Sequence, residues 1–397
     1  MNRQIYLIYA IVLADMTASS IILPILPQLV EGSKNPQIIL ALGTALFLGI
    51  QVFTVLIFGK MSDFYGRKPI FLLSAVGTFF ANTILLFQTP LSFLANRASD
   101  GLTNGAIGVV KSSITEISPS NKLQRNMGLA GSVFSIGFIV GPLLSGGLIL
   151  LLNLEGKDAI TPLIFLALSI AIINITLSLI FKETLIQTER ARGSIYQIIQ
   201  EKLNFRDAFG SLNRLQSTNE KAFKLILIQF FLTLSLGHYH YFIIFIGLGE
   251  LKMNAKEISQ FFIFMGIVNI LTNYIFFTKL VNKVQPIKFI VIIAILSIIT
   301  HIGYANIGSS KPLLYSILVF DCLTISLLPG IVDILLAEET KPNNRGEIFG
   351  YSQLFVSFAD ILTTVVFGLL SLFSFNLPFY WFAICLAPLT LTNRWLK

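Results

Sequence analysis

The chain alternates between long apolar runs and short polar connections. Because the hydrocarbon core of a membrane is about 30 Å thick, a spanning helix needs about 20 mainly apolar residues. Twelve runs reach or approach that length, and each is predicted to be one helix. The predicted helices cover residues 5–30, 38–59, 70–88, 91–115, 127–153, 159–181, 223–248, 259–278, 288–307, 313–337, 348–373 and 378–395.

The composition agrees with a chain that spans a membrane. Hydrophobic side chains make up 54% of the 397 residues and charged side chains 12%, about half the charged share of a soluble domain. Backbone in lipid must satisfy its own hydrogen bonds, which leaves helices or a closed barrel, and the long runs favour helices. The sequence therefore predicts an all-α membrane protein. The first run is expected to be a retained helix, because it is too long for a signal peptide and lacks a small-residue cleavage site.

Positive charges are distributed unevenly between alternate connections. With the N-terminus placed inside the cell, the cytoplasmic connections, the termini and the helix ends beside them hold 21 Lys and Arg residues, and the outer connections hold 5. This bias predicts that both termini are cytoplasmic. The net charge of +8 comes mainly from these flanking residues and not from one basic face, so nucleic-acid binding is not expected.

One connection, residues 183–222, is long and polar and has six predicted helices on either side. We expect an N-terminal six-helix bundle over 1–182, a cytoplasmic linker over 183–222 and a C-terminal six-helix bundle over 223–397. A spaced apolar series from Ile195 to Phe205 could form a helix on the membrane surface, and a flexible tether is the alternative. Two bundles joined by a linker are what a transporter with two rocking halves requires.

Residues 59–69, which read GKMSDFYGRKP, form a charged segment between the second and third apolar runs. Asp63 precedes Arg67 by four residues, and Gly59 and Gly66 stand where tight turns are needed. We predict a cytoplasmic turn, with Lys68 at its far side, in which one charge pair joins two helix ends. The alternative is an ordinary loop whose cations only keep it in the cytoplasm.

Ten ionisable residues interrupt the predicted membrane runs. A charge at the bilayer centre costs at least about 2.5 to 3.5 kcal/mol on insertion scales, so these residues point to function. Eight of them lie on the first, fourth, seventh and tenth helices, which predicts that every third helix faces a polar region. The eight are Asp15, Arg97, Asp100, Lys111, His238, His240, Asp321 and Asp333, and the other two are His301 and Asp360.

The fourth predicted helix is the most polar of the twelve. Arg97, Asp100, Asn104 and Lys111 recur at helical spacing, so they are predicted to share one wet stripe. Buried ion pairs, such as Arg97 with Asp100, would give the same pattern without transport chemistry.

Asp15 lies in the middle of the first helix, and we predict that it carries a proton. Desolvation favours the neutral form of a buried carboxylate, which can then take up and release a proton as its surroundings change. Asp100 is the competing candidate. Alternatively, the hydroxyls of Thr17 or Ser19 satisfy the Asp15 carboxylate locally and it has no further role.

The two histidines of the seventh helix are separated by one residue. His238 and His240 therefore point to different faces, which is poor geometry for a metal unless the helix unwinds near Gly237. A metal site is only weakly indicated, and hydrogen bonding in an aromatic-lined cavity fits these residues better. Cys322 and Cys385 fall in apolar runs without paired spacing and are interpreted as packing residues.

Four segments together resemble the Major Facilitator Superfamily. Residues 59–69 are similar to its loop between helices 2 and 3, and residues 96–101 (NRASDG) to its intramembrane arginine motif. Residues 137–147 (GFIVGPLLSGG) resemble the Gly-Pro motif of its antiporter branch. Asp15 followed by residues 23–27 (LPILP) resembles helix 1 of drug and tetracycline proton antiporters. The C-terminal half matches only in helix count and hydropathy.

This resemblance implies twelve helices in two bundles and a central cavity lined by helices 1, 4, 7 and 10. It implies that Arg97 is an electrostatic counterweight to Asp15. Glu116, at the cytoplasmic end of the fourth helix, is expected to accept hydrogen bonds from Arg67 or from a neighbouring helix end and so to lock the outward-facing state. The residues expected to let helix 5 pack closely and move are Gly137, Gly141, Pro142 and Gly146. The alternative is close packing of small residues without any motion. The cavity is expected to hold Asp15, Arg97, Asn104, Lys111, His238, His240, Asp321, Asp333 and Asp360.

The resemblance also has limits. Tetracycline antiporters carry an acid in helix 3, where this chain has Asn82, and residues 278–283 (TKLVNK) lack the glycines and the acid of a second charged hinge. We predict a monomeric, proton-coupled antiporter that exports a small organic molecule across a bacterial cytoplasmic membrane. The alternative is an exporter of a metal ion or metallophore. An enzyme or a cofactor is not expected, because the sequence shows no nucleophile triad, metal motif or phosphate loop.

Overall fold

The computed structural model describes residues 3–119, 123–185, 216, 219–280, 283–339 and 345–396, and every regular element in them is a helix. Nine helical segments among these residues are long and apolar enough to cross a membrane, and Ile136–Leu151 is a shorter apolar helix. The prediction of an all-helical membrane protein is confirmed. The number of twelve spans and the placement of the termini remain predictions, and the candidate surface helix near Ile195 lies outside the described residues.

The chain divides into two compact units. The described residues of unit 1 lie within Met1–Ile39, Leu46–Asn204 and Met253–Gly266. Those of unit 2 lie within Leu40–Ala45, Phe205–Lys252 and Ile267–Lys397. The domain boundaries at residues 183 and 222 stay a prediction, since most of the segment between them is not described.

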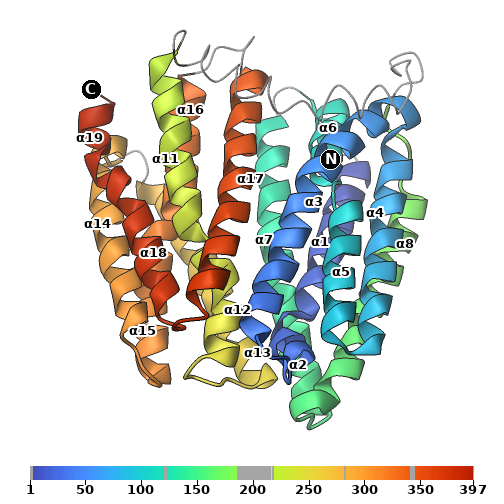
Figure 1. Cartoon of the computed structure of the whole chain (residues 1–397). Helices are drawn as coiled ribbons and strands as arrows, with labels where there is room; N and C mark the ends of the chain where they lie inside the picture. The colour runs from blue at the N-terminus through green and yellow to red at the C-terminus, as the bar shows by residue number, and fades with distance from the viewer. Residues whose placement is uncertain are drawn as a thin grey trace. The chain divides into compact units, whose positions relative to one another are not determined.

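Unit 1 is a bundle in which α1 packs against α7 and α8, and α4 packs against α5 and α8 (Figure 1). Its helices are α1 (Arg3–Ile21), α2 (Leu26–Val30), most of α3 (Pro36–Tyr65), α4 (Arg67–Ile84), α5 (Pro90–Thr103), α6 (Ile107–Ile117), α7 (Leu123–Leu151), α8 (Ile160–Ile180) and the first part of α13 (Ala255–Ile275). Short 3-10 turns lie at Leu23–Ile25, Leu85–Phe87 and Gly156–Ala159.

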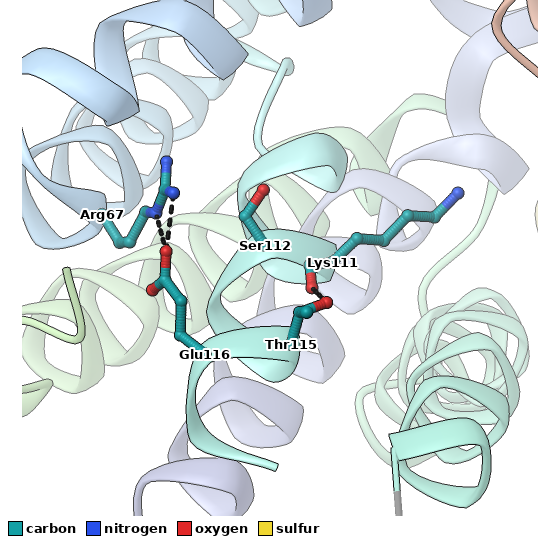
Figure 2. A pocket seen from close by; sticks show the side chains of 5 residues that line it. All are labelled: Arg67, Lys111, Ser112, Thr115 and Glu116. Carbon is teal, nitrogen blue, oxygen red and sulfur yellow. Dashed lines mark hydrogen bonds and ion pairs between the residues drawn. The ribbon is translucent and has the colours of Figure 1, made fainter. Parts of the chain in front are cut away.

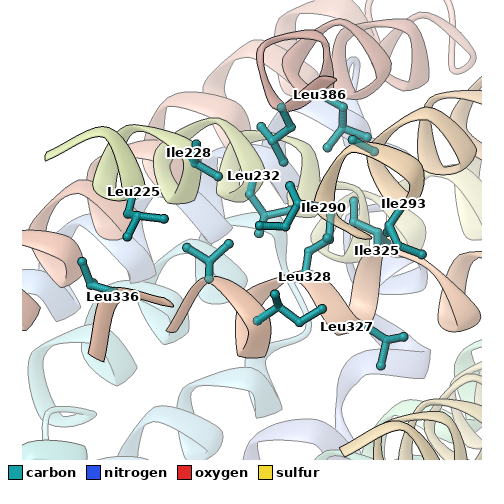
Figure 3. Packing of buried hydrophobic residues seen from close by; sticks show 14 of the residues in the cluster. Leu225, Ile228, Leu232, Ile290, Ile293, Ile325, Leu327, Leu328, Leu336 and Leu386 are labelled. Carbon is teal, nitrogen blue, oxygen red and sulfur yellow. The ribbon is translucent and has the colours of Figure 1, made fainter. Parts of the chain in front are cut away.

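Unit 2 is built around α11, which packs against α16, α17 and α18, while α14 packs against α15 and α18. Its helices are α11 (Glu220–Leu236), α12 (His238–Leu248), the rest of α13 with a π-helical end at Phe276–Leu280, α14 (Pro286–Ala305), α15 (Lys311–Leu323), α16 (Leu328–Glu338), α17 (Arg345–Leu370), α18 (Leu377–Leu386) and α19 (Thr392–Trp395). Turns at Ile325–Leu327 and Ala387–Leu391 join neighbours. Branched aliphatic side chains of α11, α14 and α16 fill the core (Figure 3).

Five predicted helices are divided in the structure. The runs over 5–30 and 378–395 each contain a short 3-10 turn, between α1 and α2 and between α18 and α19. The other three bear on the predicted site. The run over 91–115 divides into α5 and α6, the run over 223–248 into α11 and α12, and the run over 313–337 into α15 and α16. The first break separates Lys111 from Arg97 and Asp100, so the continuous stripe expected on the fourth helix is wrong. Across the breaks at Gly237 and Thr324 the runs stay largely apolar, so hydropathy alone could not reveal them. The break at Asn104 falls in a polar stretch, residues 100–105 (DGLTNG), which was interpreted as part of the wet helical stripe.

The charged segment after the second apolar run is more helical than expected. Helix α3 continues to Tyr65, and α4 begins at Arg67. The expected turn around Gly59 is therefore wrong, because this residue lies inside α3. Only Gly66 interrupts the helix, with a φ of 101° that residues other than glycine rarely adopt.

Candidate functional site

A cluster of charged groups joins α3, α4 and α6 in unit 1. The guanidinium of Arg67, only 6% exposed, donates from Nη1 to Asp63 Oδ1 at 2.6 Å and from Nη2 to Glu116 Oε1 at 2.6 Å. Arg67 Nε also donates to Glu116 Oε1 at 3.0 Å, and Nη1 donates to Ser62 Oγ. Figure 2 shows Arg67 and Glu116 facing each other. The predicted pairings of Arg67 with Asp63 and with Glu116 are thus present as contacts.

Glu183, just after α8, completes this Arg67 cluster from a fourth segment. Its carboxylate accepts the backbone N–H of Arg67 at 2.9 Å and that of Lys68 at 3.2 Å, which are orphan donors in the first turn of α4. Thr184 Oγ1 donates to the other oxygen of Glu116 at 2.6 Å. Sequence reasoning assigned Glu183 to the linker and missed this role. The available signal was an acid three residues beyond the end of an apolar helix, which is weak by itself.

Gly66 is required at this junction for two independent reasons. Its φ of 101° is unfavourable for other residues, and a Cβ atom there would lie 2.1 Å from Glu183 Oε2. Beside it, the Lys68 ammonium donates to the carbonyl oxygen of Leu179 near the end of α8 at 2.6 Å. The end of α3, the start of α4 and the end of α8 are therefore held together at one point.

A pocket of about 350 Å³ lies beside the cluster and is lined by residues of α4 and α6 (Figure 2). Its lining residues are Arg67, Lys111, Ser112, Thr115 and Glu116. Lys111 has an exposed side chain at this pocket. The structure thus places Lys111 near the Arg67 cluster and not beside Arg97, with which it was expected to form a stripe.

Asp15 is 8% exposed and lies between α1, α4 and α8. Its Oδ1 accepts a hydrogen bond from Asn174 Nδ2 at 3.0 Å and a longer one from Thr78 Oγ1 at 3.4 Å. Both partners were missed from the sequence. The alternative in which the hydroxyl of Thr17 or Ser19 satisfies the Asp15 carboxylate is wrong. In the described residues, Thr17 Oγ1 and Ser19 Oγ are buried without hydrogen-bond partners.

Arg97 is paired with Asp100 on the same helix. The shortest distance, from Arg97 Nη2 to Asp100 Oδ2, is 3.9 Å, which is an electrostatic contact and not a hydrogen bond. Arg97 Nε donates to Asn96 Oδ1 at 2.7 Å, and its guanidinium lies over the rings of Phe47 and Phe93. Within the described chain, the other carboxylate oxygen of Asp100 is buried without a partner.

Asn104 lies at the break between α5 and α6 and is buried. Its carbonyl oxygen would be unpaired at such a break, and it accepts a hydrogen bond from Gln51 Nε2 of α3 at 3.0 Å. The polar residues around Arg97 therefore join α5 to α3 within unit 1.

The predicted residues of unit 2 do not lie together. His238 and Asp321 are fully buried and in contact, with 3.0 Å between Nε2 and Oδ2. His240 has an exposed side chain, as expected for a residue on another helix face. Asp333 is exposed and accepts from Gln229 Nε2 at 3.0 Å, and Asp360 is half-buried on α17. In the described part of the chain, no three His, Cys, Asp or Glu side chains gather as a metal site would need.

The glycines of α7 meet α1 at close range. A Cβ atom on Gly141 would lie 2.0 Å from Ser20 Oγ, and one on Gly137 would lie 2.5 Å from Met16 Cβ. Ser145 Oγ donates to the Ile21 carbonyl oxygen at 2.7 Å. Further along, Gly146 faces Ser259 of α13, and Pro142 lies inside the helix. The expected close packing is present, and its role in motion stays a prediction.

Comparisons of the sequence with known proteins give one family. The sequence model of the Major Facilitator Superfamily matches residues 8–364. The tetracycline resistance protein of class H from Pasteurella multocida is 35% identical over 188 residues, which cover 46% of this chain and 46% of that protein. The class B protein from Escherichia coli is 31% identical over 150 residues, 37% of each chain. The match thus spans less than half the length of these curated relatives.

Solved structures resemble the whole chain. A human organic anion transporter aligns with a TM-score of 0.69 at 17% identity over the full length of both chains. A nucleoside transporter aligns with a TM-score of 0.75 at 13% identity, again over the full length of both. At such identities the likeness concerns the fold alone.

Proposed function

This chain belongs to the Major Facilitator Superfamily, and we propose that it is a proton-coupled antiporter that exports a small organic molecule by alternating access. The observation that carries the proposal is the environment of Asp15. Its carboxylate is buried in a membrane helix, and its hydrogen-bond donors are the neutral side chains of Asn174 and Thr78.

Such a carboxylate is suited to reversible protonation. Ionisation inside the bundle is costly, and two neutral hydrogen bonds offset only part of the desolvation. Protonation removes the charge and leaves one oxygen able to accept from Asn174. A change in hydration during the transport cycle would then shift the balance between the two forms.

Arg97 and Asp100 are proposed to act in the same process. Their 3.9 Å separation leaves the ion pair loose, and Asp100 keeps one carboxylate oxygen that has no partner among the described residues. Asp100 is therefore the second candidate for the proton in unit 1. In this assignment the positive charge of Arg97 offsets the negative charge of Asp100, its neighbour on α5.

The Arg67 cluster is proposed to be a conformational lock. It ties together the end of α3, the start of α4, the end of α6 and the segment after α8. Separating these helix ends would leave one guanidinium and several carboxylates without partners, so the cluster stabilises the state in which it is closed. Gly66 and Lys68 are proposed to hold the ends of α3, α4 and α8 together at this cluster. Elsewhere in unit 1, the glycines of α7 and Pro142 are proposed to provide the close packing against which helices move.

The relatives named as tetracycline resistance proteins suggest the kind of cargo. We propose a drug-like or metabolite-like molecule, carried by a monomer in the bilayer of a bacterial cytoplasmic membrane. His240, Asp333 and Asp360 are the proposed polar contacts for cargo in unit 2, since their side chains are exposed or half-buried. No observation favours a metal ion or metallophore as cargo.

Inverted membrane vesicles test this function. Respiration acidifies their interior, and tetracycline, followed by a panel of drug-like compounds, is added while a pH-sensitive dye reports the gradient. The proposal expects that at least one compound dissipates the gradient and accumulates inside, and that Asp15→Asn does both less than the wild type or not at all. Vesicles without the protein are the control. Accumulation of a compound without any proton movement would contradict antiport.

A further inference from the structure

A second buried ionisable pair lies in unit 2. His238 is the first residue of α12, and Asp321 lies near the end of α15. Both side chains are 0% exposed, and His238 Nε2 is 3.0 Å from Asp321 Oδ2. Two ionisable groups sealed from solvent at this distance are expensive to keep in a membrane helix bundle unless they have a function.

The geometry determines how many protons the pair holds. His238 Nδ1 is 2.9 Å from the carbonyl oxygen of Ser235, which can only accept, so Nδ1 carries a hydrogen. If Nε2 and the Asp321 carboxylate were both unprotonated, two lone pairs would face each other at 3.0 Å. One more proton therefore lies between Nε2 and Oδ2, on the imidazole or on the carboxyl group.

The surroundings of the pair are incompletely satisfied. Among the described residues, His301 Nε2 is buried without a hydrogen-bond partner. The second oxygen of Asp321 and the hydroxyls of Tyr239 and Tyr304 are buried without a hydrogen bond of ordinary geometry, although Tyr304 faces Asp321 and Tyr239 faces Asn269. A polar network kept only for structure is normally saturated, because each unpaired buried group costs free energy. Here the incompletely hydrogen-bonded atoms surround a shared proton, which is what a site that gains and loses that proton requires.

Three of the elements packed on the pair, α12, α14 and α15, contribute ionisable groups near it. Helix α14 presents His301, whose ring centroid is 4.7 Å from that of His238, and Tyr304, which faces Asp321. Tyr239 and Cys322 are the chain neighbours of the pair on α12 and α15. His301 Nδ1 lies 2.6 Å from the Ser297 carbonyl oxygen, so a neutral His301 has an open acceptor at Nε2.

The remaining surroundings add no charge of their own. Helix α18 contributes the apolar ring of Phe382, and α13 contributes the neutral amide of Asn269 near Tyr239. His240 interacts with His238 from the exposed side of α12. Lys and Arg do not occur among these neighbours, so nothing beyond the shared proton balances the charge of Asp321.

Both members of the pair stand at helix breaks. His238 follows Gly237, where a Cβ atom would lie 2.5 Å from the Thr363 side chain of α17. Asp321 lies three residues before Thr324, whose backbone leaves the helical region at φ −118° and ψ −91°. Broken membrane helices commonly form ion sites in transporters, because local rearrangement at a break can hydrate a group that is otherwise sealed.

We propose that the His238–Asp321 pair is a second proton-binding site, which carries one proton of each transport cycle in addition to that of Asp15. This inference rests on the proposed antiport function and deepens it. Release leaves neutral His238 and ionised Asp321, and the proton goes to water that reaches the pair when the breaks rearrange. Uptake reverses this step, so atoms and charge balance.

Proton counting in proteoliposomes tests the proposal, with tetracycline or another compound transported in the vesicle assay as the probe. The protons moved per substrate are expected to be one fewer in Asp321→Asn and in His238→Gln than in wild type. Exchange of labelled for unlabelled substrate at equal pH should be retained in both. Cys322→Ala is the matched control, since it alters an equally buried neighbour without removing an atom that holds the shared proton. Equal proton counts in the wild type and both variants would overturn the second site while leaving antiport intact.

Nuclear magnetic resonance of protein labelled with ¹⁵N-histidine provides a readout that needs no substrate. The chain contains three histidines, so single substitutions assign the signals. His238 should show a protonated Nδ1 and a proton shared at Nε2, should change in one step as pH rises, and should shift in Asp321→Asn. A His238 signal that is constant over the pH range in which the protein stays folded would overturn the proposal. If the wild type moves no protons with any compound, antiport fails, and this titration still decides whether the pair holds an exchangeable proton.

Discussion

The Arg67 cluster and the buried acids of the membrane helices differ in how fully their charged groups are paired and hydrogen-bonded. In the cluster, Arg67 contacts two carboxylates and a hydroxyl, and Glu183 accepts two backbone N–H groups. At Asp15 the donors are neutral, and at Asp321 one carboxylate oxygen has no hydrogen bond of ordinary geometry in the described part of the chain. One region is saturated with interactions and the other is left partly unsatisfied.

This difference separates a clamp from a titrating site. Where every charge is paired, removing a partner costs stability, and the groups have no reason to change protonation. Where a buried carboxylate meets only neutral donors, its charge is the unfavourable part, and neutralising it costs little. Measurements of folding stability in detergent should therefore distinguish the two regions before any transport assay.

Arg67→Ala is expected to have the largest effect on stability. It leaves Asp63 and Glu116 without their shared cation and should destabilise unit 1 by about 3 kcal/mol, as for other ion pairs with a buried member. Arg67→Lys is the control. It keeps the positive charge but not the planar guanidinium, so its loss of stability should lie between those of the wild type and Arg67→Ala. Thermal unfolding in detergent measures both. Equal stability of the alanine variant and the wild type would show that the cluster is not a clamp.

Gly66→Ala should be the next most damaging change, at about 2 kcal/mol, because it combines an unfavourable φ with a collision against Glu183. The two causes can be separated in a double-mutant cycle. In the Glu183→Ala background the collision is gone and only the backbone cost remains, so the second substitution should cost less than in the wild type. Strict additivity would mean that Glu183 does not lie against Gly66.

Glu183→Gln should cost about 1 kcal/mol, since the amide keeps one acceptor for the first turn of α4 but loses the negative charge at that helix end. Glu155→Gln, at an exposed acid before α8, is the matched control and should be close to neutral. Raising the salt concentration should narrow the difference between wild type and Glu183→Gln. A loss no greater than that of the control would remove Glu183 from the cluster.

Asp15→Asn should have the smallest effect on stability, below about 1 kcal/mol in either direction, because it removes a charge that forms no ion pair with a described residue and keeps an acceptor for Asn174. Asp15→Ala, which leaves Asn174 and Thr78 without their acceptor, should be worse. Unfolding at several pH values checks this order. A loss in Asp15→Asn as large as in Arg67→Ala would show that the two regions do not differ.

Much of the fold was predictable from the sequence, because a long apolar run in lipid must satisfy its own backbone hydrogen bonds and therefore forms a helix. Less could be predicted where a property depends on contacts between helices. The breaks at Gly237 and Thr324 fall within runs that remain apolar, and the polar residues at the Asn104 break were interpreted as a helical stripe. The contacts that stabilise such a break come from other helices, as with Gln51 donating to the Asn104 carbonyl.

The sites show the same division. Arg67 with Asp63 was predictable because a spacing of four residues brings the two side chains together. Glu116 was a candidate because it lies at the cytoplasmic end of the fourth predicted helix, where Arg67 or a neighbouring helix end could reach it. Asn174 and Thr78 could not be matched to Asp15, since the register of α4 and α8 against α1 is fixed by packing and not by local sequence. Glu183 was missed because it follows the end of a helix. The other acids were noticed as charges within an apolar run, and Glu183 lies outside any such run.

Proton movement coupled to substrate in reconstituted liposomes tests the central claim most directly. With purified protein and a pH-sensitive dye in the lumen, a substrate gradient should drive protons in the opposite direction through the wild type. Asp15→Asn should exchange substrate for substrate yet move fewer protons than the wild type, or none. Proton movement in Asp15→Asn equal to that of the wild type, at equal substrate flux, would contradict the assignment of Asp15 as a proton carrier.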